Sequence, residues 1–424
     1  MQTLQIIEYI IVIFMGLITL KTIIFIIFSS KNNQRRKTNK QAIWDKDYNY
    51  KMKNNNKSDI SYNPLVSILS PCYNEGITLE NCIKGFNKQS YKNFEVLIIN
   101  DGSTDNTKEV GAMLEKKYPK MVRLINKKNG GKANALNYGL KQAKGEIVIC
   151  IDADSVFKND TISQLVMPFK DPKVAAVAGN VRISNSDNLL TKNQSIEYIT
   201  GQYLEKRTFS ELDCVQVISG CVGAFRKSTL LKVGGYSSDT LVEDMDLTVT
   251  LAKNGYKIVY NPDAVAYTEA PANLKDFIKQ RYRWCYGRYE VLKKHKGILF
   301  NKKYGRIGTV GLPYYLIMPW VDVVSSIILV FALVTAILTN NLLFYAISFG
   351  IFAVPFVLLI LYIMYVDGIK EQKKLSLYAI VQSVYYSYLI NYINVKAAVD
   401  HSIGIRANWN KFGRLGANKI PGTT

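Results

Sequence analysis

The chain has 424 residues, of which 48% are hydrophobic, and a formal net charge of +21. Its six cysteines form no CxxC pair and it has only two histidines, which argues against a zinc site and fits a reducing cytoplasm. The length allows one large domain or two smaller ones.

Basic residues gather beside apolar blocks. Residues 29–57 carry nine basic and two acidic side chains, and the tail from Lys396 carries five basic side chains and one acidic side chain. The apolar blocks span residues 4–28, 310–366 and 376–398. Lysine and arginine beside a hydrophobic span mark its cytoplasmic side and attract anionic lipid headgroups. The charge therefore favours a membrane over nucleic acid as the partner.

Residues 4–28 are long enough to cross a bilayer, since about 20 apolar residues suffice. The basic cluster follows this run instead of preceding it, and no small-residue cleavage site appears, which favours an anchor over a signal peptide. We expect residues 1–28 to form a transmembrane helix with its N-terminus outside. Residues 29–63 are predicted to be a basic linker on the cytoplasmic side.

From Val66 onward, continuous apolar runs alternate with helical segments. The runs "VSILSPCYNE", "FEVLIINDGSTD" and "EIVICIDADS" each predict a buried strand that ends in a polar loop. This alternation is typical of an α/β domain, with a mostly parallel sheet covered by helices on both faces. Ligands bind such sheets at the carboxyl ends of the strands. We expect residues 64–300 to form this domain in the cytoplasm.

Residues 301–398 predict interfacial and transmembrane helices, with spans in 323–338 and 342–366. Residues 376–398 are also long enough to span. Four polar side chains on one helical stripe nevertheless favour an interfacial helix, or one that lines a polar channel. These four are Ser383, Ser387, Asn391 and Asn394. Residues 399–424 are expected to be a basic cytoplasmic tail.

Two carboxylates, Asp152 and Asp154, follow the apolar run "EIVICI". Magnesium and manganese prefer hard oxygen ligands and bind through few carboxylates plus substrate phosphates. The same "DAD" sequence also occurs in solvated turns. Its place at the end of a predicted strand favours a divalent cation site.

Three further motifs carry groups suited to chemistry. Glu243 and Asp244 offer a general base, or alternatively an ordinary acidic helix N-terminus. "QRYRW" presents Arg283, which suits a diphosphate, and Trp284, which suits a sugar ring, but such a stretch also commonly precedes a membrane. "NGGKANALN" places backbone N–H groups and Lys132 before a helix, which suits phosphate without matching the Walker pattern.

Seven motifs occur in a fixed order: "SPCYNE", "INDGSTDNT", "NGGKANALN", "DADS", "SGCVGAFRKS", "VEDMD" and "QRYRW". Together they resemble the processive family-2 inverting glycosyltransferases, which include poly-N-acetylglucosamine, cellulose, chitin and hyaluronan synthases. The resemblance covers residues 64–290 and is nearest to the bacterial poly-N-acetylglucosamine synthase group. It implies a GT-A fold, a UDP-sugar donor with UDP-GlcNAc foremost, and Mg²⁺ or Mn²⁺. It further implies a growing polysaccharide as acceptor, a multi-pass plasma-membrane location, and room for a small accessory membrane subunit.

The resemblance also implies roles for individual residues. Asp244 would be the general base, with Glu243 beside it. The implied nucleotide-sugar site is Pro71, Tyr73, Glu75, Asp101, Lys132 and Asp152, the implied metal site is Asp154 with Asp152, and the implied acceptor and diphosphate site is Gln280, Arg283 and Trp284.

Trp409 and Arg414 in the tail resemble a segment that closes over the nucleotide in related synthases, although the spacing differs. That departure, and "QRYRWCYG", leave the donor sugar and the linkage open. Two alternatives remain: a non-processive enzyme that adds one sugar to a lipid, and a membrane receptor without activity. The acceptor motif favours a polymerase over the first, and the full set of carboxylates argues against the second.

Overall fold

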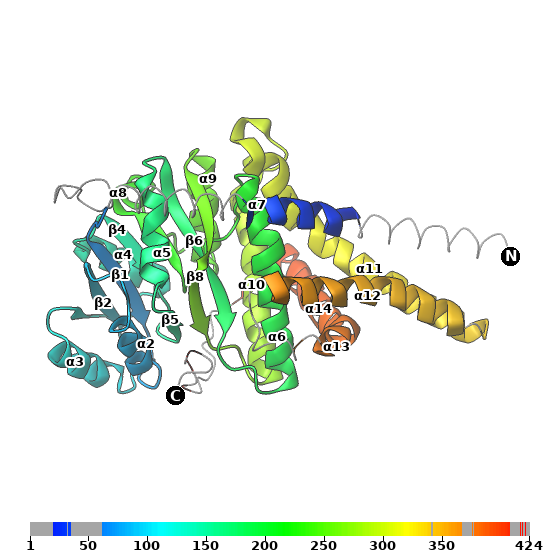
Figure 1. The fold of residues 1–424 in the computed structure, drawn as a ribbon, viewed down its shortest axis with the longest axis horizontal. Coiled ribbons are helices and arrows are strands. Elements are labelled where there is room, and N and C mark those ends of the chain that lie inside the picture. Colours follow the sequence, from blue (N-terminus) through cyan, green and yellow to red (C-terminus); the bar gives the residue numbers. More distant parts are fainter. Residues whose placement is uncertain are drawn as a thin grey trace, which may run out of the picture.

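The computed structural model describes residues 20–31, 33–34, 62–340, 342–366, 375, 377–407, 416, 418 and 420. An eight-stranded sheet forms one half of this part of the chain, and long helices extend from the other half (Figure 1). Most of the predicted N-terminal helix and linker, together with Trp409 and Arg414, lie outside the described residues.

The sheet has the strand order β3-β2-β1-β4-β7-β6-β8-β5. Strands β1 to β4 pair in parallel, and β6 pairs in parallel with β8. Strand β7 is antiparallel to both β4 and β6, and β5 is antiparallel to β8. The strands are β1 (Val66–Cys72), β2 (Phe94–Asp101), β3 (Val122–Lys127), β4 (Ile147–Cys150), β5 (Ser155–Phe157), β6 (Val174–Ile183), β7 (Gly223–Arg226) and β8 (Lys257–Thr268).

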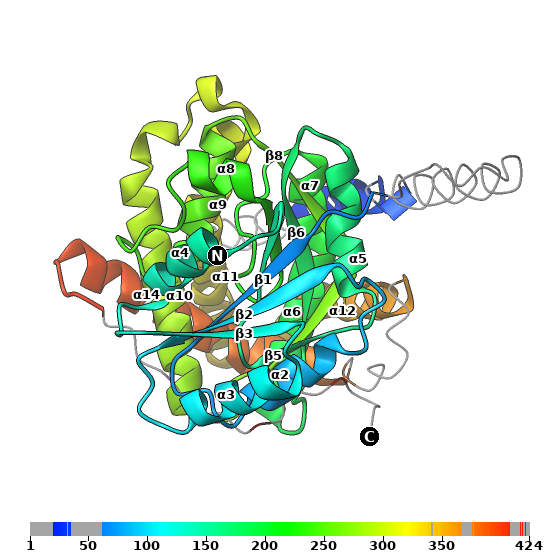
Figure 2. The same ribbon diagram turned by 90° about the vertical axis from the view of Figure 1, so that its left-hand side faces the viewer.

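Helices cover both faces of the sheet. Successive side chains of a strand point to opposite faces, so each strand contributes to a hydrophobic core on either side. Val96 and Ile98 of β2 pack into a core with α2, α3 and α5, whereas Leu97 and Ile99 pack into a second core with α4, α8 and α9. The elements of both layers can be followed in Figure 2. The helices are α2 (Leu79–Phe86), α3 (Thr107–Lys117), α4 (Lys132–Gln142), α5 (Thr161–Val166), α8 (Lys227–Lys232) and α9 (Glu243–Lys253), with the short turn η1 (Met167–Lys170) after α5.

The register brings the ends of the central strands to one edge of the sheet. Cys72 of β1 lies beside Asn100 of β2, and Leu69 lies beside Cys150 of β4. The polar motifs that follow these three strands therefore meet at the same edge, where parallel sheets bind their ligands.

A second group of helices stands against the sheet domain. It comprises α6 (Leu189–Thr200), η2 (Gly201–Lys206), α7 (Arg207–Glu211), α10 (Leu274–Lys294), η3 (Lys296–Ile298), η4 (Lys302–Tyr304), η5 (Ile307–Gly311), α11 (Leu312–Leu338), α12 (Leu342–Val366), α13 (Ala379–Val381), η7 (Gln382–Tyr386) and α14 (Ser387–Ser402).

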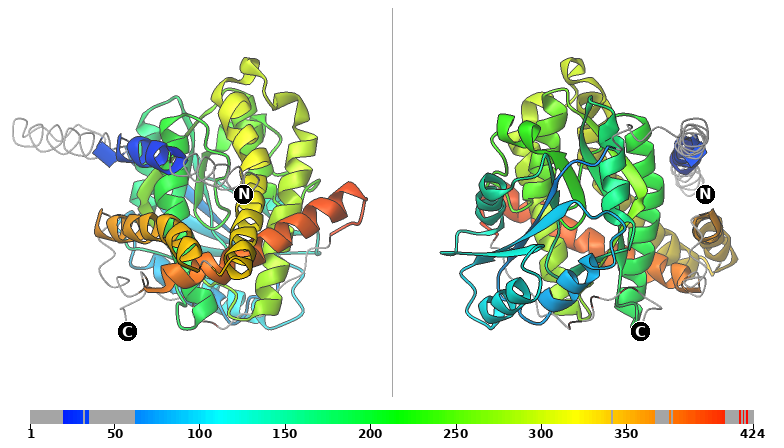
Figure 3. Two further views of the ribbon diagram at one scale, coloured as in Figure 1. Left: turned by 90° about the vertical axis from the view of Figure 1, so that its right-hand side faces the viewer. Right: turned by 60° about the vertical axis from the view of Figure 1, so that its left-hand side comes forward.

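Helix α14 packs against both α10 and α11. Figure 3 shows this group of helices from two sides. The Asn391 side chain donates to Ser326 Oγ of α11 over 2.6 Å. Asn394 Oδ1 accepts from Tyr289 Oη of α10 over 2.9 Å. Two of the four polar residues of the predicted stripe thus connect α14 to its neighbours.

Within the described ranges, one helical segment is long and apolar enough to cross a membrane, Ile307–Leu338 with 32 residues. A shorter apolar helical stretch is Phe356–Tyr365, inside α12. Residues 20–31 are helical, and they include the last nine positions of the predicted N-terminal helix, 20–28.

Candidate active site

One cavity of about 1700 Å³ lies between the carboxyl edge of the sheet and the second group of helices. All twelve candidate residues that the structure describes line it, whereas Trp409 and Arg414 lie outside the described residues. The twelve are Pro71, Tyr73, Glu75, Asp101, Lys132, Asp152, Asp154, Glu243, Asp244, Gln280, Arg283 and Trp284.

The loop after β1 is held in place by buried hydrogen bonds. Thr78 Oγ1 donates to Glu75 Oε2 over 2.7 Å, and the Glu75 backbone N–H donates to Thr107 Oγ1 over 2.7 Å. Asn74 has a φ of 55°, a left-handed conformation that asparagine tolerates better than most residues. These contacts fix the "SPCYNE" loop at the cavity wall, against the start of α3.

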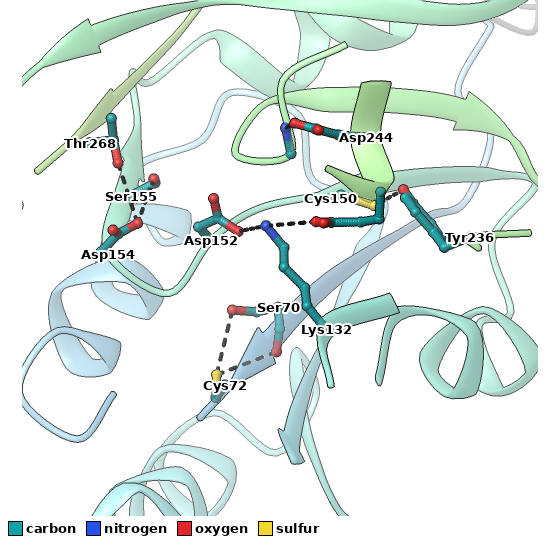
Figure 4. A network of polar contacts seen from close by, with 12 residues as sticks. Ser70, Cys72, Lys132, Cys150, Asp152, Asp154, Ser155, Tyr236, Asp244 and Thr268 are labelled. Atoms are coloured by element: carbon teal, nitrogen blue, oxygen red, sulfur yellow. Dashed lines mark hydrogen bonds and ion pairs between the residues drawn. The ribbon is translucent and has the colours of Figure 1, made fainter. Parts of the chain in front are cut away.

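Asp101 ends β2 and organises the glycine loop. Its carboxylate accepts from the Gly130 N–H over 3.0 Å, from the Gly131 N–H over 2.8 Å, and from Lys127 Nζ. The sequence predicted that these glycine N–H groups would cradle phosphate. The structure corrects this, because both groups already donate to a buried carboxylate. Lys132 of the same motif lines the cavity and points toward Asp152 (Figure 4).

Lys132 connects two acidic motifs (Figure 4). Its Nζ lies 2.7 Å from Asp152 Oδ1, at the end of β4, and 3.2 Å from Glu243 Oε1, at the start of α9. Burial opposes the charge of Lys132, but the carboxylates of Asp152 and Glu243 outweigh it and hold the pKa of Lys132 well above its usual value. A permanent positive charge therefore sits among the carboxylates of the site.

Asp154 is 4% exposed and is oriented by two hydroxyl groups. Ser155 Oγ donates to its Oδ1 over 3.1 Å, and Thr268 Oγ1 of β8 donates over 3.3 Å. No cluster of three His, Cys, Asp or Glu side chains suited to a metal occurs among the described residues. Magnesium needs only one or two carboxylates when substrate phosphates complete its shell, so Asp152 and Asp154 fit such an ion.

Asp244 lies in the first turn of α9, and both of its carboxylate oxygens accept backbone hydrogen bonds. The donors are the Gly220 N–H, at 3.2 Å, and the Met245 N–H, at 2.8 Å. A Cβ at Gly220 would lie 3.0 Å from Lys132 Nζ, so the glycine leaves room for the lysine. Burial, followed by the charge of Glu243, raises the pKa of Asp244. Such a carboxylate is a stronger base than an exposed one.

The "QRYRW" motif lies on α10 and reaches the cavity with three side chains. Arg283 Nη1 donates to the Leu241 carbonyl over 3.2 Å. Gln280 is 8% exposed, and its Oε1 has no hydrogen-bond partner among the described residues. Trp284 lies beside Arg281, a residue of the same motif that the sequence analysis did not single out.

Comparisons with known proteins decide the family. The model described as "Glycosyl transferase family 2" matches residues 67–234. A Staphylococcus epidermidis protein named "Poly-beta-1,6-N-acetyl-D-glucosamine synthase" is 34% identical over 324 residues, which cover 73% of this chain and 76% of that protein. The chain belongs to glycosyl transferase family 2. The resemblance drawn from the seven motifs is thereby confirmed.

A protein of the same name from Staphylococcus aureus (strain COL) is 39% identical over 241 residues, 56% of this chain. The match spans 58% of the length of that relative. Among solved structures, a mannosyltransferase from Pyrobaculum calidifontis in complex with GDP-Man and Mn2+ matches with a TM-score of 0.60 and 20% identity. The match covers 91% of this chain and 99% of the other. At this identity the likeness shows the fold alone, and it confirms the predicted GT-A-like α/β fold.

Several residues that line the cavity lie outside the motifs of the sequence, so their place in the site could not be predicted. Lys206 of η2 donates to Ser219 Oγ over 2.8 Å, and burial lowers the pKa of Lys206 to about 8. Glu197 and Tyr386 contact each other although they are 189 positions apart. Arg281, by contrast, could have been found through its place in "QRYRW".

Proposed function

We propose that this chain is a membrane-embedded processive β-glycosyltransferase that polymerises UDP-GlcNAc into an exported exopolysaccharide. The observation that carries the proposal is one continuous cavity, which runs from Lys132 and its carboxylates past α10 to Ser326 and Asn391 between α11 and α14. Such a cavity offers room for a donor at the sheet edge and for an acceptor chain that extends toward the apolar helices. The name that the staphylococcal relatives share supports N-acetylglucosamine as the sugar.

Buried amides support a carbohydrate acceptor. Four glutamines that line the cavity are each at most 9% exposed and have an amide atom without a hydrogen-bond partner among the described residues. Leaving a buried polar group unpaired costs about 1–3 kcal/mol, and sugar hydroxyls can both donate to and accept from amides. The side chains of these glutamines line the cavity, where their amides are placed to meet the hydroxyl groups of a glycan. They are Gln202, Gln216, Gln280 and Gln382.

In the proposed mechanism, Asp244 takes the proton of an acceptor hydroxyl while that oxygen attacks the anomeric carbon of the donor. The bond from that carbon to the UDP oxygen breaks, and one displacement inverts α to β. The raised pKa of Asp244 suits it to accept the proton. Lys132 and Arg283 supply positive charge for the departing diphosphate. Glu243 holds Lys132 in place through its ion pair.

Asp154, with Asp152, would hold Mg²⁺ or Mn²⁺. When bound, the ion would neutralise charge on the departing diphosphate. The Ser155 and Thr268 hydroxyl groups keep Asp154 oriented for this ligation. The Lys132 ion pair does the same for Asp152.

The membrane part of the proposal rests on α11, α12 and the N-terminal helix. Residues Ile327, Val330, Phe331 and Val334 of α11 are exposed, which suits contact with lipid. We place the catalytic domain, residues 64–300, in the cytoplasm, with residues 1–28 and 301–398 as membrane and interfacial helices of a multi-pass plasma-membrane protein. Membrane lipids and a small accessory subunit are the further partners proposed.

The test is UDP release by the detergent-purified protein with Mg²⁺ or Mn²⁺, one UDP-sugar at a time, with products sized on a gel. We expect UDP-GlcNAc to give high-molecular-weight product. A one-sugar product made only with added lipid would replace the proposal with a glycolipid transferase. Absence of UDP release with every donor would overturn the enzymatic assignment.

A further inference from the structure

We infer that Arg281 is a positioning residue that holds the indole of Trp284 at the acceptor site, anchored by Glu197 and Tyr386. The inference rests on the proposed function, and it takes the indole of Trp284 to stack on the acceptor sugar, the role that its place in "QRYRW" suits. It assigns different tasks to the two arginines of "QRYRW".

The three contacts of Arg281 carry the inference. The guanidinium carbon lies 4.4 Å from the centroid of the Trp284 ring. Arg281 Nη2 donates to Glu197 Oε2 over 2.8 Å and to Tyr386 Oη over 3.4 Å. Tyr386 Oη donates to the same Glu197 oxygen, which closes a triangle of polar contacts. Glu197, Arg281, Trp284 and Tyr386 all line the catalytic cavity.

The helix geometry explains why Arg281 reaches Trp284. Positions 277, 281 and 284 are spaced four and three residues apart, so they share one face of α10. The Arg281 guanidinium lies over both the Phe277 ring, at 5.1 Å, and the Trp284 ring. A planar guanidinium stacks on aromatic faces, which a lysine ammonium does less well.

Arg281 is 4% exposed, so its charge needs a fixed partner. Burial opposes the charge, but Glu197 outweighs it and the pKa of Arg281 is raised. Glu197 lies on α6, and Tyr386 ends η7 in the C-terminal helical segment. The orientation of Trp284 is therefore set by elements far from α10 in the sequence.

Arg283 has different surroundings. Its Nη1 donates to the Leu241 carbonyl, close to Glu243 and Asp244 in the chain, where the diphosphate is proposed to leave. Arg281 instead contacts aromatic rings and Glu197. Loss of Arg281 should therefore weaken acceptor binding and leave donor binding unchanged.

Tyr386→Phe is the mildest test, because it keeps the Arg281–Glu197 ion pair and removes one hydroxyl group. Tyr385→Phe is the matched control. Tyr385 Oη accepts from Asn193 Nδ2 over 2.9 Å, so it joins the same two elements without touching Arg281. The assay measures kcat and the KM values for UDP-GlcNAc and for a short β-1,6-linked N-acetylglucosamine oligosaccharide. We expect Tyr386→Phe to raise the KM for the oligosaccharide about three- to tenfold at unchanged donor KM, and Tyr385→Phe to change neither.

Arg281→Lys supplies a readout that does not depend on activity. In a background where Trp44, Trp320 and Trp409 are replaced by Phe, Trp284 is the sole tryptophan. We expect Arg281→Lys to shift its fluorescence emission, because the planar guanidinium stacked on the indole is replaced by an ammonium that stacks less well, and Tyr385→Phe to leave it unchanged.

The inference would be overturned if Tyr386→Phe left the KM for the oligosaccharide unchanged and Arg281→Lys left the emission of Trp284 unchanged. It would also be overturned if Tyr385→Phe changed either quantity as much as these variants do. Failure of the wild-type protein to release UDP from UDP-GlcNAc would instead overturn the proposed function. In that case the emission of Trp284 still decides whether Arg281 positions it.

Discussion

Replacing Asp244 by asparagine is the sharpest test of the proposed mechanism. The amide has nearly the same shape as the carboxylate, but it cannot accept the proton of the acceptor hydroxyl. Loss of a general base lowers rates by about 10²- to 10⁴-fold. We therefore expect Asp244→Asn to reduce sugar transfer by that factor while UDP still binds.

The structure also sets the expected effect on stability. The two Asp244 oxygens accept the Gly220 and Met245 N–H groups. An amide has one acceptor oxygen, so one of these donors loses its partner, at a cost of about 1–3 kcal/mol. Burial and the charge of Glu243 disfavour ionised Asp244, so a neutral side chain recovers part of that cost. The net change in unfolding free energy should stay below about 2 kcal/mol.

The assay combines single-turnover transfer from UDP-GlcNAc, calorimetric UDP binding, and thermal unfolding in detergent. Glu243→Gln is the comparison variant: it weakens the ion pair with Lys132 but leaves Asp244 in place, so its loss of rate should stay below about tenfold. An Asp244→Asn protein that keeps more than about a tenth of the wild-type rate would refute the base assignment. Loss of UDP binding would indicate a role in the donor site or in folding.

Three further predictions follow from the same contacts. Burial and the charge of Glu243 raise the pKa of Asp244, and the base works only when it is deprotonated. We therefore expect kcat/KM to fall as the pH drops through a value above the ordinary carboxyl pKa of about 4. A pH–rate profile whose acid limb lies at or below that value would contradict this expectation. Gly220→Ala should lower kcat, by at most about tenfold, with a nearly unchanged melting temperature, since the new Cβ would stand 3.0 Å from Lys132 Nζ and push it by a few tenths of an ångström from its carboxylate partners; wild-type kcat would show that the lysine has room to spare. Removal of divalent ions with EDTA should stop UDP release, and Mg²⁺ or Mn²⁺ should restore it; release that persists in EDTA rules out the proposed metal role of Asp154.

The sequence predicted the part of the fold that local patterns determine. Buried parallel strands are continuous apolar runs, so β1, β2 and β4 were recognisable. The rule that ligands bind at the carboxyl ends of such strands also predicts that Asp101, Asp152 and Asp154 lie at one site, and all three line the cavity.

Features that depend on distant partners could not be predicted in this way. Strand β7 is short and its antiparallel pairing with β4 and β6 leaves no trace in its own four residues. The Gly130 and Gly131 N–H groups looked available for phosphate because the sequence does not show that Asp101 lies opposite them. Both features depend on residues that are distant in the sequence and become neighbours only when the chain is folded.

The attachment of α14 has a consequence for how this protein is made on the ribosome. Chains emerge N-terminus first, and domains generally begin to fold in that order. The sheet and α10 are therefore synthesised well before Tyr386, which contacts Arg281, and Asn394, which contacts α10. The part of the cavity beside α10 is therefore complete only after α14 has been translated. Under the proposed membrane location, the apolar helices α11 and α12 are made before this last wall of the cavity is in place.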